Sequence, residues 1–401
     1  MPRFQRPRGE EQRATTLELF FDLVFVFAVT QISRLLHAQL TWEGLGRATV
    51  ALLVVWWAWN YTTWVTNELD PESTVVRLVL MALAFASLLM AVAIPDAFGA
   101  RAGLFAGSYV AIQVGRHLFL AFGAEERGTP ERMRALRVLA WFLASAPLWI
   151  AGAAAGGAAR TGLWLAALLI EYSAPLALYW LPGRRRAAPD AWEVQTAHFA
   201  ERFQLFVIIA LGESIVVTGA TAAGLHLGAA RLAAFALAFV GTAAMWWLYF
   251  DYAVRIAERR LELSPDRTRM ARDAYTYLHA LIVAGVIAAA VGDQVAIAHP
   301  TAHGGVGEVA AVVAGPAVYL LAQALFRLRM AGSLSRKRAA GALACAAAGA
   351  TGAFAPLLVP AALATAAIVA VIAAEQISGA RRRGRGAASP LERLEASAAG
   401  R

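Results

Sequence analysis

The chain has 401 residues, of which 59% are hydrophobic and only 16% are charged, and its formal net charge is +9. A soluble chain of this length usually has about 25% charged residues, so this composition argues against an ordinary soluble protein. The apolar residues come in blocks of about twenty that short polar gaps separate, which predicts an all-α, polytopic helical membrane protein surrounded by a lipid bilayer.

Twelve apolar stretches follow one another along the chain, and we interpret each as a transmembrane helix. The first is too long for a signal peptide and lacks a clear cleavage site, so it is interpreted as a retained span. The last two meet at the segment PLLVPAAL, which is compatible either with a sharp turn or with a kink in a single element. The twelve stretches cover residues 16–37, 45–66, 74–95, 101–122, 133–156, 161–181, 198–222, 229–252, 273–297, 308–330, 338–357 and 359–378.

The arginine and lysine residues predict the orientation of these spans. If the N-terminus is inside the cell, the cytoplasmic segments hold 28 of these residues and the outer loops hold 3. Loops on the cytoplasmic side of membrane proteins carry such an excess of positive charge. The pattern therefore predicts twelve helices with both termini cytoplasmic.

Four ordered pairs of segments indicate an internal repeat. ELFFDLVFVFAVTQI from Glu18 resembles ERFQLFVIIALGESI from Glu201, and WWAWNY at Trp56 resembles WWLYFDY at Trp246. Because each half has an even number of spans, both halves enter from the cytoplasm, and we expect about 12 transmembrane helices as two parallel six-helix repeats, related by an axis along the membrane normal. The two remaining pairs begin at Met81 and Leu278 and at Gly107 and Gly315.

The repeat and the loops together define the expected organisation. The basic run RRRGRG near the C-terminus is interpreted as contacting anionic lipid rather than RNA, so no nucleic-acid partner is predicted. The segment HPTAH has a spacing suited to metal ligands but lacks a partner cluster, so neither a metal site nor a cofactor is predicted. The expected parts are a cytoplasmic N-terminal arm (1–15), a first repeat (16–181), a cytoplasmic linker (182–197), a second repeat (198–378) and a basic cytoplasmic tail (379–401).

The segments TTLELFFDLVFVFAVTQIS, WWAWNYTTW, HFAERFQLFVIIALGESI and WWLYFDY occur in this order and together resemble the bacterial low temperature requirement A (LtrA) family. The resemblance covers roughly residues 13 to 380. It departs at Gln204, where such proteins more often have a small residue, and it is weak over the last two spans. It implies a multi-pass protein of the bacterial inner (plasma) membrane, linked by name to growth in the cold. It implies no reaction and no catalytic residues, so no enzyme activity is predicted.

Ionisable residues deep within the predicted spans are the candidate functional residues, because an ionised group at the bilayer centre costs roughly 2.5–3.5 kcal/mol unless it faces protein or water. Asp22 and Arg116 lie at similar depths in the first and fourth spans. We expect them to form a buried ion pair, which either fixes helix packing or opens as a gate. Their counterparts in the second half, Leu205 and Ala324, are both uncharged, as expected if neither charge is tolerated alone.

Glu18 and Glu201 occupy matching positions at the cytoplasmic ends of the two halves. Glu18 with Asp22, and His198 with Arg202, are spaced four residues apart on their helix faces. The two glutamates either anchor the helices at the membrane interface and stabilise their N-termini, or form two acidic vestibules beside a central cavity. We expect the carboxylates of the first span to face the helix bundle rather than lipid.

Glu213 lies deep in the seventh span, within the segment LGESIVVTG, whose small and hydroxyl residues make room for a polar site. Its counterpart in the first span is Thr30. Glu213 is either a structural, hydrogen-bonded carboxyl or a group that couples transport to a proton or an ion. Glu171, near the middle of the sixth span, is a similar case, and His279 lies in the inner third of the ninth span.

These observations lead to one hypothesis and one alternative. The hypothesis is a secondary transporter or ion pathway, coupled to protons or ions, that moves an unidentified small solute; the sequence has no ATP-binding segment, so the driving force would be an ion gradient. The alternative is a non-transporting membrane assembly factor or a lipid-directed enzyme. The candidate residues are spread over several depths and the cytoplasmic loops are short, which favours transport. The sequence predicts no particular oligomeric state.

Overall fold

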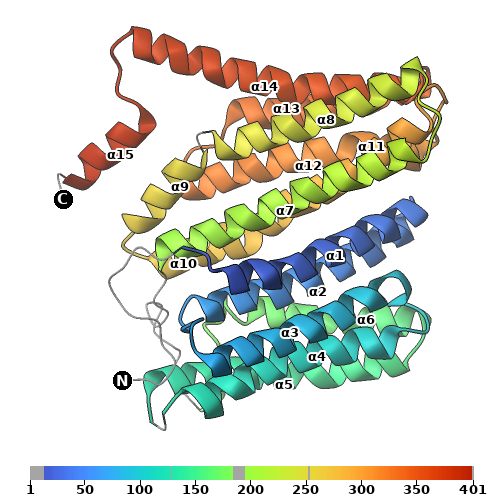
Figure 1. Cartoon of the computed structure of the whole chain (residues 1–401). Helices are drawn as coiled ribbons and strands as arrows, with labels where there is room; N and C mark the ends of the chain where they lie inside the picture. Colours follow the sequence, from blue (N-terminus) through green and yellow to red (C-terminus); the bar gives the residue numbers. More distant parts are fainter. Residues whose placement is uncertain (1–12, 127, 184–194, 252, 400–401) are drawn as a thin grey trace. The chain divides into compact units, whose positions relative to one another are not determined.

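The computed structural model describes the chain except for residues 1–12, 127, 184–194, 252 and 400–401. Over the described residues the regular elements are helices, labelled α1 to α15 in Figure 1, so the predicted all-α class is confirmed. The chain divides into two compact units, Met1–Arg202 and Phe203–Arg401. Because the division falls within helix α7, the first residues of α7 belong to the first unit and the rest of the helix belongs to the second.

In the first unit, α1 packs against α2 and α3, α3 against α4, α4 against α5, and α5 against α6 (Figure 1). Consecutive helices are therefore mostly neighbours in space, as short connections require. The elements are α1 (Thr16–Ala38), α2 (Trp42–Thr66), α3 (Thr74–Ala93), the 3₁₀-helix η1 (Ile94–Asp96), α4 (Ala102–Leu118), the π-helical η2 (Phe119–Ala124), α5 (Pro130–Ala154), α6 (Gly157–Ser173) and the start of α7 (Thr196–Ala223).

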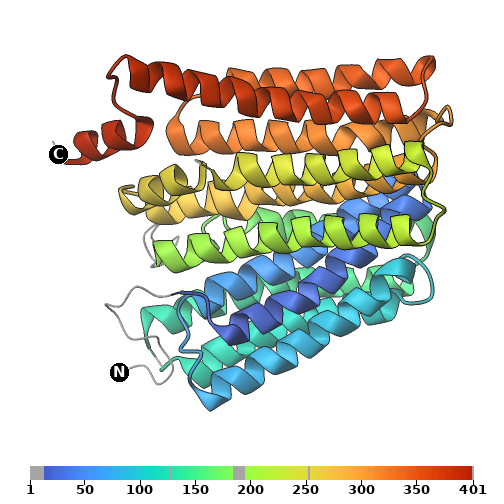
Figure 2. The same cartoon turned by 45° about the horizontal axis from the view of Figure 1, so that its top comes forward.

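In the second unit, α11 packs against α8 and α12, α12 against α13, α13 against α14, and α14 against α8. Figure 2 shows α12, α13 and α14 side by side. The elements after α7 are α8 (Ala229–Phe250), α9 (Ala253–Glu262), α10 (Arg267–Ala271), the π-helical η3 (Arg272–Leu278), α11 (His279–Ala298), α12 (Val306–Ala331), α13 (Arg336–Ala348), the 3₁₀-helix η4 (Gly349–Ala353), α14 (Leu358–Gly384) and α15 (Pro390–Ala399).

Several helices begin where side chains satisfy the free backbone N–H groups of the first turn. The Thr15 hydroxyl accepts from the backbone N–H of Glu18, and the Glu18 carboxylate accepts from the backbone N–H of Thr15, which is a capping box. Thr41 and Thr129 cap α2 and α5 in the simpler way, and Pro130 occupies the first position of α5. These local signals place the helix starts within a few residues of the predicted ones.

Eight helices in the described part of the chain are long and apolar enough to cross a membrane, so the chain is a multi-span helical membrane protein. Each of the twelve predicted stretches overlaps a helix, but α2, α4, α6 and α13 are not among the eight. α4 and α6 have 17 residues each and α13 has 13, lengths that rise less than the roughly 30 Å of a hydrocarbon core. The eight are α1, α3 with η1, α5, α7, α8, the stretch Arg267–Ala298, α12 and α14.

Glycines let α11 and α12 pack with their backbones in contact. A methyl group added to Gly315 would lie 2.1 Å from the backbone nitrogen of Ala289, and one added to Gly285 would lie 2.6 Å from the backbone nitrogen of Tyr319. Gly292 is similarly crowded, at 2.4 Å from a carbonyl oxygen of α12. Small residues allow this close approach between membrane helices, where packing rather than the hydrophobic effect drives association.

Candidate functional site: a buried cluster of charged residues

Four ionisable side chains meet inside the first unit, where α1 contacts residues 196–202 of α7. Glu18 and Asp22 come from α1, and His198 and Arg202 come from α7. None of the four side chains exposes more than 1% of its surface. The prediction that the carboxylates of the first span face protein is therefore confirmed. The spacing of four residues on both helices turns each pair toward the other helix.

Arg202 holds both carboxylates. Its guanidinium lies 3.1 Å from Oε1 of Glu18 and donates to Oδ1 of Asp22 at 2.6 Å. The indole N–H of Trp59, on α2, donates to the same Asp22 oxygen at 2.8 Å. Nε2 of His198 lies 3.1 Å from the Glu18 carboxylate. Charge-assisted hydrogen bonds of this length are among the stronger polar contacts in proteins, so the cluster ties α1 to the start of α7.

The hydrogen bonds of Asn67 select the tautomer of the neutral His198 ring. The Asn67 amide satisfies both of its ends when its oxygen accepts from the backbone N–H of Gln195 at 3.1 Å and its NH₂ group donates to the backbone oxygen of Gln195 at 3.3 Å. In this orientation the NH₂ group also donates to Nδ1 of His198 at 3.2 Å. Nδ1 is then an acceptor, so the proton of the neutral imidazole is on Nε2 and points at Glu18.

The charges of the cluster do not balance when His198 is neutral. One guanidinium faces two carboxylates, so a negative charge remains in a fully buried place. In addition, Oδ2 of Asp22 has no hydrogen-bond partner among the described residues. A buried carboxylate oxygen without a partner is costly, and a proton, a water molecule or a cation at that oxygen would complete the site. The described part of the chain has no group of three or more His, Cys, Asp or Glu side chains placed to hold a metal ion.

The predicted ion pair between Asp22 and Arg116 is wrong, because Asp22 pairs with Arg202 instead. Depth in the membrane selected Arg116 from the sequence, but it does not determine which helices touch. The guanidinium of Arg116 donates to the hydroxyl of Thr62 at 2.9 Å and to the backbone oxygen of Ala58 at 3.2 Å, both on α2. Arg116 thus satisfies a helix backbone rather than a carboxylate.

Arg116 is connected to Glu171 through two neutral side chains. Its guanidinium donates to the amide oxygen of Gln113, whose NH₂ group donates to the hydroxyl of Tyr109 at 3.0 Å. The Tyr109 hydroxyl in turn donates to the Glu171 carboxylate. All four side chains are buried, with at most 1% exposed. The positive charge of Arg116 and the negative charge of Glu171 thus offset each other through this chain of hydrogen bonds rather than by direct contact. The sequence analysis did not consider such indirect pairing.

The Glu171 carboxylate accepts three side-chain hydrogen bonds and thereby connects three helices. Besides the Tyr109 hydroxyl from α4, it accepts from the Ser145 hydroxyl at 2.6 Å and from the Trp149 indole at 2.8 Å, both from α5. A carboxylate that accepts three hydrogen bonds is well stabilised in a buried place. This environment favours the structural interpretation of Glu171.

The second unit has a similar network, which the sequence analysis missed. The NH₂ group of Gln323 donates to the Tyr319 hydroxyl at 3.1 Å, and its oxygen accepts from Arg338 at 2.8 Å. Arg338 also donates to both carboxylate oxygens of Glu375 at 3.0 Å and to the backbone oxygen of Leu248 at 3.3 Å. The sequence signal was a tyrosine followed four residues later by a glutamine, which occurs in both the fourth and the tenth predicted spans.

The remaining predicted residues lie outside the charged cluster. Glu201 is half-buried, and its carboxylate accepts from the backbone N–H of Ala14 at 2.8 Å, so its environment differs from that of its counterpart Glu18. Glu213 lies on α7 in the second unit and is 3% exposed. The hydroxyls of Ser214 and Thr218 donate to carbonyls of their own helix at 3.3 and 2.8 Å, so they satisfy themselves locally.

His279 is held in the second unit by two hydrogen bonds. Its Nδ1 lies 3.1 Å from the backbone oxygen of Ala274, and its Nε2 lies 2.8 Å from the Tyr249 hydroxyl. A carbonyl can only accept, so Nδ1 carries a proton and donates to it. In the neutral imidazole Nε2 then accepts from Tyr249. His279 is fully buried, and its ring stacks on that of Tyr275 with 4.7 Å between centroids.

Eight helices in the described part of the chain are long and apolar enough to cross a membrane, and charged networks are buried within both units, which defines a polytopic integral membrane protein. The chain belongs to the family described as Bacterial low temperature requirement A protein (LtrA), whose model matches residues 13–374, so the predicted family is confirmed. It is 38% identical over 320 residues to "Uncharacterized protein RA0937" of Rhizobium meliloti (strain 1021), a match that covers 79% of this chain and 77% of that protein. No solved structure matches the chain.

Proposed function

We propose that this LtrA-family protein is a secondary transporter, and that its coupling ion is a proton that binds in the cluster of Glu18, Asp22, His198 and Arg202. The observation that carries the proposal is the charge of this cluster. With His198 neutral, two buried carboxylates face one guanidinium, and Oδ2 of Asp22 lacks a hydrogen-bond partner among the described residues. Intramembrane ionisable groups of this kind are typical of proton relays in transporters.

Proton binding at Asp22 has a direct mechanical consequence in this proposal. A proton on Oδ2 removes the negative charge that Arg202 binds, and it leaves Glu18 as the only charged partner of the guanidinium. The contact between α1 and α7 weakens when Asp22 is neutral and tightens when the proton leaves. A titratable contact between two helices can thus bias two arrangements of the protein, which is what coupling requires. We propose transport of a small solute rather than catalysis.

The proposal includes twelve transmembrane helices in two parallel six-helix repeats. One support is that Gln113 on α4 and Gln323 on α12 each donate to the hydroxyl of a tyrosine one helical turn earlier, Tyr109 and Tyr319. Each of these glutamines also accepts from an arginine. The same local network thus occurs in the fourth helix of each proposed repeat.

A second support for the repeat is the other contact of each arginine. Arg116 donates to the backbone oxygen of Ala58 and Arg338 to that of Leu248. Ala58 and Leu248 are the residues directly after the two Trp-Trp pairs, so they are at matching positions. The arginines themselves come from different helices, α4 and α13. In the proposed repeat the accepting residues Ala58 and Leu248 are therefore at matching positions, whereas the donating arginine comes from a different helix in each half.

The four helices that are less apolar or shorter fit the same proposal. On α2, every side chain in residues 54–63 is buried. A helix surrounded by protein needs no lipid-facing apolar surface, so its composition can be more polar than that of a lipid-exposed span. The orientation in this proposal has both termini in the cytoplasm, as the distribution of arginine and lysine predicts.

Infrared spectroscopy of the purified protein tests the proton site without knowledge of the solute. We expect a carbonyl band of a protonated carboxylic acid that appears on acidification and is missing in Asp22→Asn. The matched control is Glu171→Gln, which removes a saturated buried carboxyl and should leave this band in place. A band that persists unchanged in Asp22→Asn would contradict the assignment.

Transport itself is tested in liposomes with an internal pH-sensitive dye and a panel of small solutes. We expect the wild-type protein to dissipate a pH gradient when its solute is present, and Asp22→Asn to stop this flux while still inserting into the membrane. Glu213→Gln is measured in parallel, because the sequence analysis also proposed that Glu213 takes up the proton. Loss of flux in Glu213→Gln alone would move the coupling site to that residue.

A further inference from the structure

Asn67 ends helix α2 and binds the backbone just before α7. Its own backbone N–H donates to the carbonyl of Thr63 at 3.1 Å, which fixes the residue at the end of α2. Its side-chain oxygen accepts from the backbone N–H of Gln195 at 3.1 Å, and its NH₂ group donates to the backbone oxygen of Gln195 at 3.3 Å. Asn67 is 1% exposed. The two contacts to Gln195 determine which end of the amide faces His198.

The end that faces His198 is the NH₂ group, which lies 3.2 Å from Nδ1 of the ring. The opposite ring nitrogen, Nε2, lies 3.1 Å from each oxygen of the Glu18 carboxylate. A neutral ring with its proton on Nε2 satisfies both neighbours, because Nε2 donates to Glu18 and Nδ1 accepts from Asn67. The second proton of an imidazolium would be on Nδ1, so it would point at the NH₂ donor rather than at an acceptor.

Turning the Asn67 amide around does not resolve this conflict. Its oxygen could then accept from a protonated Nδ1, but the same oxygen would lie 3.3 Å from the carbonyl oxygen of Gln195, and the NH₂ group would lie 3.1 Å from the backbone nitrogen of Gln195. Two hydrogen bonds would be replaced by two contacts between like groups in a buried place, where unsatisfied polar groups are costly. A charged His198 therefore requires the contacts between Asn67 and Gln195 to break.

The Glu18 carboxylate is surrounded by donors as well. Oε2 accepts from the backbone N–H and from the hydroxyl of Thr15, both at 2.9 Å, and Oε1 lies 3.1 Å from the Arg202 guanidinium. Together with His198, these donors favour the ionised form of Glu18. Of the two carboxylates in the cluster, only Asp22 has an oxygen, Oδ2, without a hydrogen-bond partner among the described residues.

We propose that Asn67 is a positioning residue that keeps His198 neutral, so that the cluster retains the excess negative charge that a proton can neutralise. The charged groups that face the ring and Asp22 are Glu18 and Arg202. An imidazolium would balance the two carboxylates with two cations and would leave no excess charge for a proton at Asp22. That Asp22 is the proton acceptor rests on the proposed function, whereas the neutral state of His198 does not.

Nitrogen NMR of the full-length protein, labelled at its histidines and reconstituted in liposomes, measures the state of His198 directly. A neutral ring gives two well-separated nitrogen signals, because one nitrogen carries a proton and the other does not, whereas an imidazolium gives two similar signals. The signals of His198 are assigned by their loss in His198→Gln. We expect a neutral His198 at neutral pH in the wild type, with its proton on Nε2. An imidazolium there would overturn the proposal.

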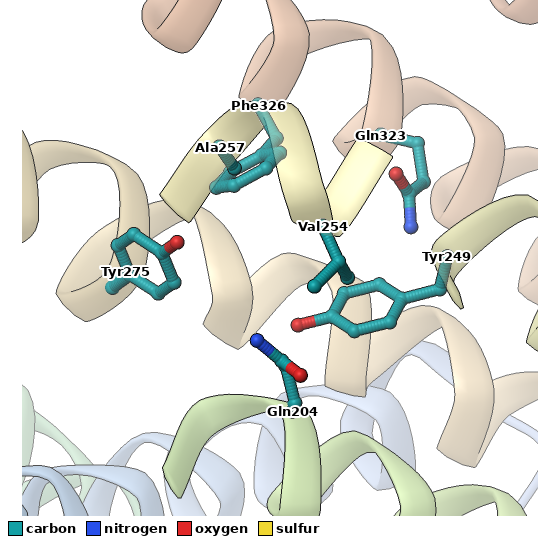
Figure 3. A pocket seen from close by; sticks show the side chains of 7 residues that line it. All are labelled: Gln204, Tyr249, Val254, Ala257, Tyr275, Gln323 and Phe326. Carbon is teal, nitrogen blue, oxygen red and sulfur yellow. The ribbon is translucent and has the colours of Figure 1, made fainter. Parts of the chain in front are cut away.

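His279 is an internal reference in the same spectra. It lies in the second unit, and its two contacts are with the carbonyl of Ala274 and the hydroxyl of Tyr249 rather than with an amide. Figure 3 shows Tyr249 beside a small pocket of that unit, with Gln204 across from it. The His279 signals should be the same in the wild type and in variants of Asn67. Equal changes at both histidines would contradict a local positioning role.

Asn67→Asp keeps the size of the side chain and gives Nδ1 of His198 a partner that only accepts when it is ionised. The protonated fraction of His198 at neutral pH should then rise at least ~10-fold, because the carboxylate stabilises the imidazolium. If His198 stayed as neutral in Asn67→Asp as in the wild type, the side chain at position 67 would not control the ring.

Asn67→Ser adds no charge and links the two readouts. The serine hydroxyl can accept from Nδ1, so His198 can take the first proton. The infrared band of protonated Asp22 should then appear at a pH lower by at least ~1 unit, because a nearby imidazolium favours the ionised carboxylate. Gln31→Ser is the matched control: it removes a buried amide from α1, ~13 Å along the helix from Asp22, and should change neither readout. A neutral His198 and an unshifted Asp22 band in Asn67→Ser would overturn the proposal.

A failure of the proposed function is distinguishable from a failure of this inference. His198 that is neutral in the wild type and charged in Asn67→Asp supports the positioning role of Asn67 even if no carboxylic acid band depends on Asp22. That combination would instead contradict Asp22 as the proton site. His198 that is charged in the wild type would contradict the role of Asn67, whatever band Asp22 shows.

Discussion

Arg202 donates a hydrogen bond to Oδ1 of Asp22 across 2.6 Å, although the two residues are 180 positions apart in the chain. The contact joins the first helix of the first unit to the beginning of α7. Both side chains are fully buried, so their hydration has been replaced by this contact and by those to Glu18 and Trp59. The energetic consequences of this replacement can be measured.

Removing the arginine should destabilise the protein strongly. Arg202→Ala leaves Glu18 and Asp22 buried without their shared cation, a loss of about 3–5 kcal/mol for a broken buried ion pair. The midpoint of thermal unfolding in detergent should fall and the yield of folded protein should drop. Arg77→Ala is the control: Arg77 and Glu72 form an exposed pair, whose loss should cost less than ~1 kcal/mol. Equal effects of the two substitutions would contradict the role of Arg202.

Glu171→Gln tests whether the sixth helix holds an ionised carboxylate. The glutamine NH₂ group would face hydroxyl and indole donors, and at least one buried donor would lose its acceptor, at a cost of about 1–3 kcal/mol. Ser145→Ala removes one of the hydrogen-bond donors to the Glu171 carboxylate and leaves no buried donor without an acceptor. It should therefore destabilise the protein less than Glu171→Gln does. Thermal unfolding in detergent measures both. A Glu171→Gln protein as stable as the wild type would mean that the carboxyl is protonated in the native state.

Gly315→Ala should disrupt the packing of α11 against α12. The added methyl group would lie 2.1 Å from a backbone nitrogen, and a backbone cannot move aside as a side chain can. We expect a lowered midpoint of thermal unfolding in detergent and a lower yield of folded protein. Gly219→Ala is the matched control within the same unit, since nothing lies within 4 Å of the added methyl group there. If Gly315→Ala were as well tolerated, the two backbones would not be in contact.

Reporter fusions test the proposed orientation. Tags at either terminus and in the segment 253–272 should be accessible from the cytoplasm only, because arginine and lysine are concentrated in those segments. A tag in the loop between α11 and α12 should be accessible from the outside. A C-terminal tag that reports the outer side would require an odd number of crossings and would exclude twelve.

The amino-acid sequence by itself determined the class of this protein and the places of its helices. Apolar runs and capping residues such as Thr15 and Thr129 act over a few positions, so they can be read without knowledge of the fold. The burial of Glu18 and Asp22 also followed from the sequence, because a charge within a membrane-grade helix has to face protein or water. The family was identified separately, from the resemblance of four segments that occur in a preserved order.

Only the tertiary structure decided which residues meet. Asp22 was paired with Arg116 on depth alone, but its partner is Arg202, because α1 contacts the start of α7 and that contact depends on the complementary surfaces of distant helices. The link from Arg116 to Glu171 depends on the neutral side chains of Gln113 and Tyr109, which no charge count identifies. The direct pairing of Arg338 with Glu375 depends in the same way on which helices touch. Hydropathy can be read along the chain, whereas the pairing of side chains depends on which helices contact one another in the fold.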